Sequence, residues 1–315
     1  MNQLTVSSSP HIRSSRTTKQ VMLDVIIALL PVSIASVIIF GLKSLALIAT
    51  CVIAAIASEF LFNLACKKDQ TIYDLSAAVT GLILALNLPT TVDLWQAAIG
   101  SIVAIVVVKC LFGGIGKNFA NPAMVGRIVL FLSFSAKVAG ESNPVIKSIG
   151  TIDAVSGATP LSESAVTVPS TLQLLFGLHG GAIGETCAIA LIIGGIYLLA
   201  RRIITWHIPV AFIGTVMLCA LLAGEDPIVH VLSGGLLIGA IFMATDYVTS
   251  PATPWGKIIF GIGCGLITAV IRLLGSYPEG VSFAILLMNI LSPYIEKWTV
   301  MRPLGTKKAK GGEAK

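Results

Sequence analysis

The chain has 315 residues, of which 55% are hydrophobic and only 11% are charged, and its mean hydropathy is +0.92. Soluble globular domains carry about 25% charged residues, so this composition excludes a soluble domain and predicts an all-α integral membrane protein. The formal net charge of +6 would suit a nucleic-acid-binding protein, but the basic residues are distributed as in a membrane protein, so no nucleic acid partner is expected.

Ten apolar segments lie between charged or Pro- and Gly-rich breaks. Because a membrane-spanning helix needs about 20 residues, each segment is a candidate span, although several are short. No small-residue cleavage site follows the first segment, which indicates a retained helix rather than a signal peptide. The expected membrane helices are 21–40, 44–66, 74–88, 95–112, 122–137, 185–200, 208–223, 228–245, 256–274 and 280–296.

The basic residues indicate how the chain is oriented in the membrane. If the N-terminus is cytoplasmic, 17 of the 21 basic residues lie at cytoplasmic ends of the expected helices, and four do not. This is the positive-inside bias of a multispanning membrane protein. It predicts a cytoplasmic N-terminal segment (1–20), a cytoplasmic tail (301–315) and an extracytoplasmic loop (138–184).

The two halves of the chain share a faint pattern, which predicts two five-helix repeats at 21–137 and 185–300. In each half an Asp-led apolar stretch is followed by a Trp that opens a span and then by a Gly-rich turn. An odd number of spans inverts the second repeat in the membrane. Segments 87–91 and 245–254 would then break helices on opposite sides and line a site at the repeat interface. The alternatives are shared membrane composition and simple connecting loops.

A small, polar, Gly-containing stretch at 153–161 lies in the expected extracytoplasmic loop. Its Ser-Gly-Ala-Thr sequence at 156–159 resembles the site at which bacterial respiratory flavoproteins carry FMN, esterified through its phosphate to the threonine hydroxyl. Gly157 and Ala158 leave room for a phosphate, and Gly157 can adopt the positive φ that turns successive amides toward an anion. Asp153 would accept the hydroxyl proton during attachment. The alternative is an ordinary Ser/Gly/Thr turn in an exposed loop.

Three further segments are similar to those of one membrane flavoprotein family. They are the Gly-rich Asn-Pro-Ala segment at 113–127, Gly-Gly-Ala-Ile-Gly-Glu-Thr at 180–186 and Thr-Asp-Tyr-Val-Thr-Ser-Pro at 245–251. Together with the ten expected spans and the flavin-like stretch, they make the chain resemble the RnfD/NqrB family over residues 10–305. The resemblance is closer to RnfD, the smaller member, of the Rnf (ferredoxin:NAD oxidoreductase) complex.

This resemblance implies a cofactor, a set of partners and a reaction. A separate flavin transferase would attach FMN covalently to Thr159, and some members have a second, non-covalent flavin that no residue here locates. The chain would be a subunit of an ion-translocating oxidoreductase in the bacterial cytoplasmic membrane. With the other Rnf subunits it would relay electrons from ferredoxin toward NAD and couple this to Na⁺ or H⁺ export. No Rossmann fingerprint is present, so NAD is expected to bind elsewhere. The expected cofactor-binding residues are Thr159, Asp153, Ser156, Gly157, Ala158 and Leu161.

Ionisable residues inside the expected spans are candidates for ion coupling, because placing a charge at the membrane centre costs about 2.5–3.5 kcal/mol. Glu59 is the foremost candidate, followed by Asp24 and Asp246. Glu59 could carry an ion or a proton, pair with a basic residue, or face a neighbouring subunit. Asp246 is also expected to form a structural ion pair with Arg127.

Two alternatives stay open at this point. An inverted-repeat bundle with an Asn-Pro-Ala turn at 121–123 is compatible with a channel or small-solute transporter without flavin. Aquaporin-like channels, however, carry that tripeptide once in each half, and the second half here has none. The six cysteines are single, with no Cys-x-x-Cys, so no metal site held by this chain alone is expected. One cysteine could still complete a metal site shared with another subunit.

Overall fold

The computed structural model describes residues 16–139, 142, 170–177, 179–275 and 280–300. Within these ranges the regular secondary structure is helical, and the β-pairing consists of one isolated antiparallel bridge between Ser142 and Gly181. Each of the ten expected segments contains helix. The sequence prediction of an all-α chain is therefore confirmed for the described residues.

The first half of the chain begins with two long helices that meet at Gly41. Gly41 has a φ of 76°, which an L side chain rarely adopts, and so permits the sharp reversal between them. Short helices follow, and the fourth span changes from an α-helix to a π-helix partway along. The elements are α1 (Thr18–Phe40), α2 (Leu42–Ala65), η1 (Ile72–Asp74), α3 (Ser76–Leu86), α4 (Leu94–Ile102), η2 (Val103–Cys110), α5 (Pro122–Ser133) and α6 (Ser135–Val138).

In the described part of the second half, five helical segments follow the short helix Thr171–Phe176, and one of the five is interrupted. Gly234 and Gly235 both have a φ of 70° and break the expected helix at 228–245 into two parts. Pro254 at the first position of the next helix, with the Thr253 hydroxyl accepting from the Gly256 amide, restarts the helix after the following loop. The elements are α7 (Thr171–Phe176), α8 (Ala188–Ala200), α9 (His207–Ala223), α10 (Pro227–Leu232), α11 (Leu236–Ile238), η3 (Gly239–Met243), α12 (Pro254–Leu274) and α13 (Val281–Thr299).

Three helices, α1, α2 and α12, are long and apolar enough to cross a membrane by length and composition. Shorter apolar helices are α3, α4 with η2, α5, α8 and α9. Large apolar side chains cover the outward faces of these helices; Ile38 of α1, for example, is 61% exposed. Such an apolar exterior suits a protein surrounded by lipid.

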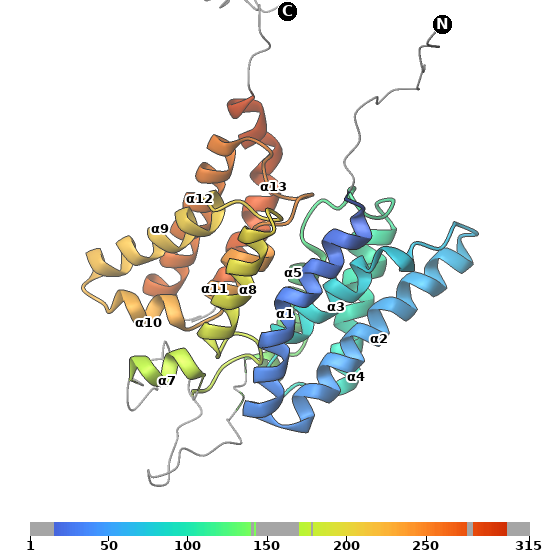
Figure 1. The fold of residues 1–315 in the computed structure, drawn as a ribbon, viewed down its shortest axis with the longest axis horizontal. Helices are drawn as coiled ribbons and strands as arrows, with labels where there is room; N and C mark the ends of the chain where they lie inside the picture. Colours follow the sequence, from blue (N-terminus) through green and yellow to red (C-terminus); the bar gives the residue numbers. More distant parts are fainter. Residues whose placement is uncertain (1–15, 140–141, 143–169, 178, 276–279, 301–315) are drawn as a thin grey trace, which may run out of the picture.

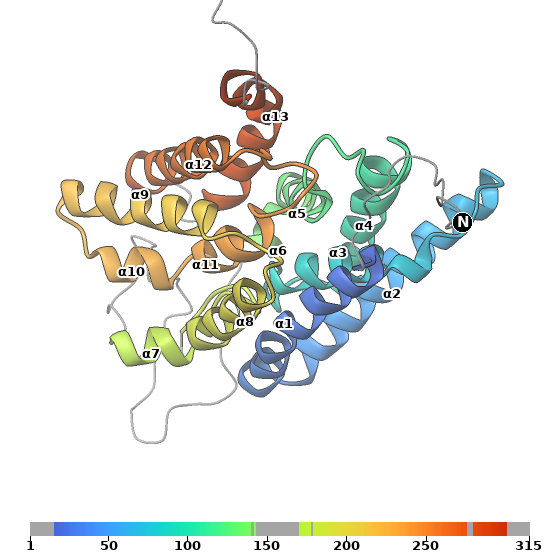
Figure 2. The same cartoon turned by 45° about the horizontal axis from the view of Figure 1, so that its top comes forward.

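The two halves of the chain lie side by side, α1 to α5 on one side and α8 to α13 on the other (Figures 1 and 2). Helices of the two halves contact each other where α1 packs on α8 and where α5 packs on α13. At the first contact, a Cβ on Gly194 would lie only 2.3 Å from the carbonyl oxygen of Ala28, so the two backbones touch. Gly261 and Gly265 of α12 similarly face the backbone carbonyls of Ile208 and Phe212 on α9, and small residues of this kind let membrane helices pack closely.

The start of α1 and the end of α13 lie toward the same end of the molecule, and α7 lies toward the other (Figure 1). Close to α7, the C-terminal end of α3 pairs with the non-helical stretch before α8 inside the protein. The amide of Gly184 donates to the carbonyl of Leu86 (2.7 Å), and the amide of Ile183 donates to that of Leu88 (3.1 Å). The backbone groups that end α3 are thereby satisfied without water.

Candidate functional site

The flavin-like stretch at 153–161 lies outside the described residues, so the roles predicted for six of its members stay predictions. These are Asp153, Ser156, Gly157, Ala158, Thr159 and Leu161. The described part of the chain contains a different candidate site. It is a cavity of about 450 Å³ between the two halves, at the end of the molecule where α1 begins.

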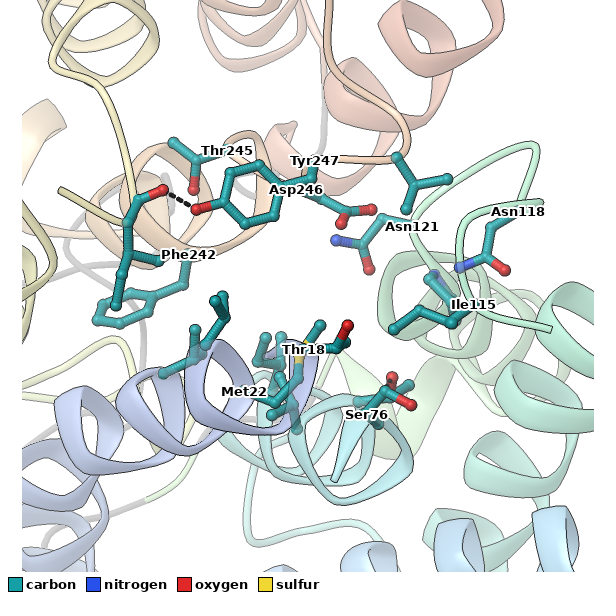
Figure 3. Close-up of a pocket in the computed structure, with 18 of the residues that line it drawn as sticks. Thr18, Met22, Ser76, Ile115, Asn118, Asn121, Phe242, Thr245, Asp246 and Tyr247 are labelled. Carbon is teal, nitrogen blue, oxygen red and sulfur yellow. Dashed lines mark hydrogen bonds between the residues drawn. The ribbon is translucent and has the colours of Figure 1, made fainter. Parts of the chain in front are cut away.

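Side chains from several separate segments of both halves enclose this cavity (Figure 3). Thr18 and Met22 come from α1, and Ser76 from α3. The loop before α5 and the stretch after η3 close the opposite side. Most of the wall is aliphatic or aromatic, and the polar groups are a few amides and hydroxyls, the carboxyl of Asp246 and the basic side chains of Arg16 and Lys109.

Asn121 holds the two halves together at the cavity. Its Oδ1 accepts hydrogen bonds from the amides of Ala123 (3.0 Å) and Met124 (3.4 Å) and thereby caps the start of α5. Its Nδ2 donates to the carbonyl of Met243, at the end of η3 (3.3 Å). The Asn-Pro-Ala turn therefore acts in this structure as a helix cap and a link between the halves.

The Gly-rich turn before α5 forms the rim of the cavity. Gly113, Gly114 and Gly116 have φ values of 109°, 94° and 87°, in the region that L side chains rarely adopt. This turn brings Ile115 and Asn118 to the cavity (Figure 3). Oδ1 of Asn118 is buried and has no hydrogen-bond partner among the described residues.

The stretch that follows η3 supplies Asp246 and Tyr247. Oδ2 of Asp246 accepts a hydrogen bond from the Thr249 hydroxyl (3.0 Å). The Tyr247 hydroxyl donates to the carbonyl of Ile203 (Figure 3). The helix break predicted at 245–254 therefore does line a cavity between the halves, while the break predicted at 87–91 is packed against the segment at 180–186.

Glu59 is almost fully buried, and it has a basic partner. Nζ of Lys109 lies 2.8 Å from Oε1 of Glu59 and 2.6 Å from the hydroxyl oxygen of Ser76. The Thr71 hydroxyl also donates to Oε1 of Glu59 (2.5 Å), and Nδ2 of Asn63 donates to Thr71 (3.0 Å). Lys109 and Ser76 line the cavity, so this network forms part of its wall. Of the roles open for Glu59, the geometry favours pairing with a basic residue.

Asp24 links the two halves of the chain. Its carboxylate accepts from the Tyr197 hydroxyl (2.9 Å) and lies 3.2 Å from Nη2 of Arg201, both at the end of α8. The Arg201 side chain is half exposed, with 51% of its surface accessible, so the pair contributes little more than a surface ion pair would. Asp24 therefore has a structural partner, and its role in ion coupling stays a prediction.

The expected ion pair between Arg127 and Asp246 was wrong. Nη1 of Arg127 instead donates to the side-chain oxygens of Asn87 (3.3 Å) and Ser282 (3.0 Å). Arg127 lies well inside α5, beyond the capping turn that borders the cavity, so its side chain meets the end of α3. Arg127 therefore lies near the Asn87 segment. The charge pattern counts it among the 17 basic residues at the cytoplasmic ends.

Lys109 and Glu185 are buried polar groups that the sequence pattern does not single out. The charge bias places Lys109 among the cytoplasmic residues, although it is 2% exposed. The signal that could have identified it is its place inside the long apolar run at 95–112. In the sequence, Glu185 is distinguished only by belonging to the 180–186 segment, yet its side chain is buried and the residue is 3% exposed.

Comparison with known proteins identifies relatives over the whole length of the chain. The NQR2, RnfD, RnfE family matches residues 5–305. An Acetobacterium woodii protein, named as a component of a Na⁺-translocating ferredoxin:NAD⁺ oxidoreductase complex, is 48% identical, with 98% of each chain covered. The corresponding component of a proton-translocating complex in Clostridium ljungdahlii is 41% identical, again with 98% of each chain covered. A component of an ion-translocating oxidoreductase complex of Escherichia coli is 34% identical over 96% of this chain and 99% of its own. The chain therefore belongs to the NQR2, RnfD, RnfE family.

Proposed function

We propose that this chain is the RnfD-type membrane subunit of an ion-translocating ferredoxin:NAD⁺ oxidoreductase complex in a bacterial membrane. The observation that carries the proposal is the near-complete coverage, at up to 48% identity, of relatives named as this component of such complexes. Such a subunit acts as part of a translocating enzyme and has the other subunits of the complex as partners. The apolar exterior of α1, α2 and α12 is consistent with a place in the membrane.

Within this function, we propose that Thr159 carries FMN through a phosphoester, attached by a flavin transferase. When bound, FMN transfers electrons one at a time, which suits a relay between neighbouring carriers. The residues around Thr159 would hold the phosphate and leave space for it, as Gly157 and Ala158 permit. The support is the Ser-Gly-Ala-Thr sequence at 156–159, which occurs once in the chain.

The cavity between the halves is our candidate for a second, non-covalent flavin. Its volume of about 450 Å³ lies within the usual range of small-molecule sites, about 300–1,000 Å³. Val79, Ile83 and Phe242 provide apolar surface for a planar heterocycle. Nδ2 of Asn118 points into the cavity (Figure 3) and can donate a hydrogen bond to a carbonyl on the ring edge. The residues present therefore fit the chemical character of a flavin.

We also propose that the helices form two inverted five-helix repeats. The supporting observation is that matching helices have matching neighbours. In the first half α2 packs on α3 and α4, and η2 packs on α5; in the second half α9 packs on α10 and α12, and α12 packs on α13. Between the halves, each of α1 and α5 contacts its own counterpart, α8 and α13, as a twofold relation requires.

The proposed orientation puts both termini in the cytoplasm and the 138–184 loop outside. It is supported by the basic-residue bias and by the position of α7, which directly follows 143–169 and lies at the end opposite to the start of α1 and the end of α13 (Figure 1). In this orientation the cavity opens toward the cytoplasmic side and Thr159 lies outside. The cavity and the covalent site would then serve opposite faces of the membrane.

For ion coupling, the three predicted carboxylates differ in their surroundings. Glu59 and Asp24 have basic partners, Lys109 and Arg201. Asp246 borders the cavity and has the Thr249 hydroxyl as a partner. Of the three, Asp246 is the one whose carboxylate can be reached through the cavity, so we propose it as the coupling residue on that side.

The test of this function is the Thr159→Ala variant, purified with its complex. The wild-type chain should give a band that fluoresces yellow-green in a denaturing gel, and the variant should give none while still assembling. Thr167→Ala is the matched control, because it removes a threonine hydroxyl from the same 138–184 loop outside the 153–161 stretch and leaves the acceptor in place. Retained fluorescence in Thr159→Ala would overturn the flavin assignment. A colourless wild-type chain would favour the alternative, an inverted-repeat transporter without flavin.

A further inference from the structure

Three buried side-chain oxygens near the C-terminal end of α7 have no hydrogen-bond partner among the described residues. They are Oε2 of Glu185, Oγ1 of Thr186 and Oγ of Ser233, and each residue is no more than 3% exposed. Polar atoms buried in this way are normally satisfied by protein, by ordered water or by a ligand. None of the three residues lines the cavity described above.

Two glycines hold the carboxylate of Glu185 in place. Its Oε1 accepts a hydrogen bond from the amide of Ala182 (2.7 Å). A Cβ on Gly181 would lie 2.9 Å from Oε1, and a Cβ on Gly235 would lie 2.7 Å from Oε2. Gly235 stands at the break between α10 and α11, two residues after Ser233. Oε2 of Glu185 therefore lies against the break in the helix that also carries Ser233.

Glu185 differs from the other carboxylates of low exposure in the described ranges. The other two buried carboxylates of those ranges are Asp24 and Glu59. Asp24 has Arg201 and Glu59 has Lys109 within 4 Å, whereas no basic group of the described chain lies that close to Glu185. A buried carboxylate with a single amide donor is unfavourable unless it is protonated or a cation accompanies it.

The nearby basic side chains make contacts other than with Glu185, although Nε2 of His179 is also buried without a hydrogen-bond partner among the described residues. Arg272 donates to the carbonyls of His230 (2.6 Å), Ser233 (3.3 Å) and Gly234 (2.7 Å), and so satisfies the carbonyl groups where α10 ends. Nδ1 of His179 faces the carbonyl of Gly180 (2.9 Å) and must carry a proton to bond with it. Burial lowers the pKa of His179, so the ring is neutral at physiological pH.

We propose that Glu185, with the hydroxyl oxygens of Thr186 and Ser233, binds a monovalent cation such as Na⁺. Carboxylate and hydroxyl oxygens are the ligands that hard cations prefer, and all three residues are buried. The site rests on the proposed function in one respect, since the cation would be the one the complex moves. It lies at the opposite end of the α11–η3 helix from Asp246, so the two carboxylates would serve opposite faces of the membrane.

The experiment measures Na⁺ binding directly, by equilibrium dialysis of ²²Na⁺ against the full-length protein in nanodiscs with choline chloride holding ionic strength constant. Wild type should bind Na⁺ saturably. Glu185→Gln keeps the shape of the side chain and should weaken binding at least tenfold, and Thr186→Val should weaken it severalfold. Glu225→Gln, which alters an exposed carboxylate paired with His230, is the matched control and should bind like wild type.

A second measurement distinguishes loss of the cation site from misfolding of the variant. Thermal unfolding of wild type should shift upward with added NaCl and reach a plateau, and that shift should be absent in Glu185→Gln. Three results would overturn the proposal: no saturable binding by wild type, unchanged binding by Glu185→Gln, or stabilisation that follows pH and not Na⁺. None of these depends on covalent flavin, so failure of this site and failure of the Thr159 assignment are separately visible.

Discussion

Lys109 and Glu59 form an ion pair with 2.8 Å between Nζ and Oε1, and their side chains are only 3% and 1% exposed. The pair joins the π-helical segment η2 to α2, and a second hydrogen bond from Lys109 to Ser76 extends it to α3. A π-helical turn places side chains differently from an α-helix and is common at functional sites. Here it directs a lysine into the wall of the cavity rather than toward lipid or water.

This relationship predicts opposite outcomes for single and double substitutions. Lys109→Met leaves the Glu59 carboxylate buried without its cation and should destabilise the protein by about 3–5 kcal/mol. The double variant Glu59→Gln/Lys109→Met removes both charges and should recover at least half of that loss. Denaturant unfolding in nanodiscs measures both. If the double variant is as unstable as the single one, electrostatics is not the origin of the effect.

The contact between α1 and α8 predicts sensitivity at Gly194. A methyl group there would lie 2.3 Å from the Ala28 carbonyl oxygen, so Gly194→Ala should destabilise the protein by about 1–3 kcal/mol through overpacking. Gly214→Ala on α9 is the matched control, because no atom lies within 4 Å of its Cβ position, and it should be neutral or gain up to about 1 kcal/mol in helix propensity. Equal thermal stability of the two variants would contradict the backbone contact.

If the cavity holds the second flavin, filling the cavity should remove that flavin without removing the covalent one. Thr80 lines it from α3, and Thr80→Trp should fill much of the space. The extractable, non-covalent flavin of the variant should fall by more than tenfold while in-gel fluorescence from the covalent flavin is unchanged. Leu222→Trp, at a residue that is 78% exposed on α9, controls for an added indole. Full retention of extractable flavin in Thr80→Trp would place that flavin outside the cavity.

The orientation can be tested with one introduced and one native cysteine. Ser148→Cys, in the 138–184 loop, should react with an impermeant thiol reagent in whole cells. Cys66 is exposed just after α2, at the predicted cytoplasmic side, and should react only after lysis. Comparing the variant with and without Cys66→Ser assigns each labelled thiol. Labelling of Cys66 in whole cells and of Ser148→Cys only after lysis would show the opposite orientation. Thr159 would then lie on the cytoplasmic side, where an extracytoplasmic flavin transferase could not reach it.

The helical segments could be predicted because each is an apolar run bounded by charged or Pro- and Gly-rich breaks. The break at Gly234 and Gly235 could not, because glycines are common in membrane helices and the side chains that pack against this break, Glu185 and Arg272, come from other segments. The charge pattern alone assigns Lys109 and Arg127 to one side of the membrane. Their partners Glu59, Ser76, Asn87 and Ser282 come from other helices, and pairing of that kind cannot be read from one stretch of sequence.

The touching backbones of α1 and α8 also restrict how the two halves can move. Translation of α8 by one helical turn would bring Ala190 or Leu198 to the place of Gly194, where even a methyl group collides with the Ala28 carbonyl. Sliding along this contact is therefore blocked, whereas rotation about it leaves the contact intact. The α1–α8 contact therefore resists sliding of one half along the other, and rotation about it is the relative motion that this contact permits.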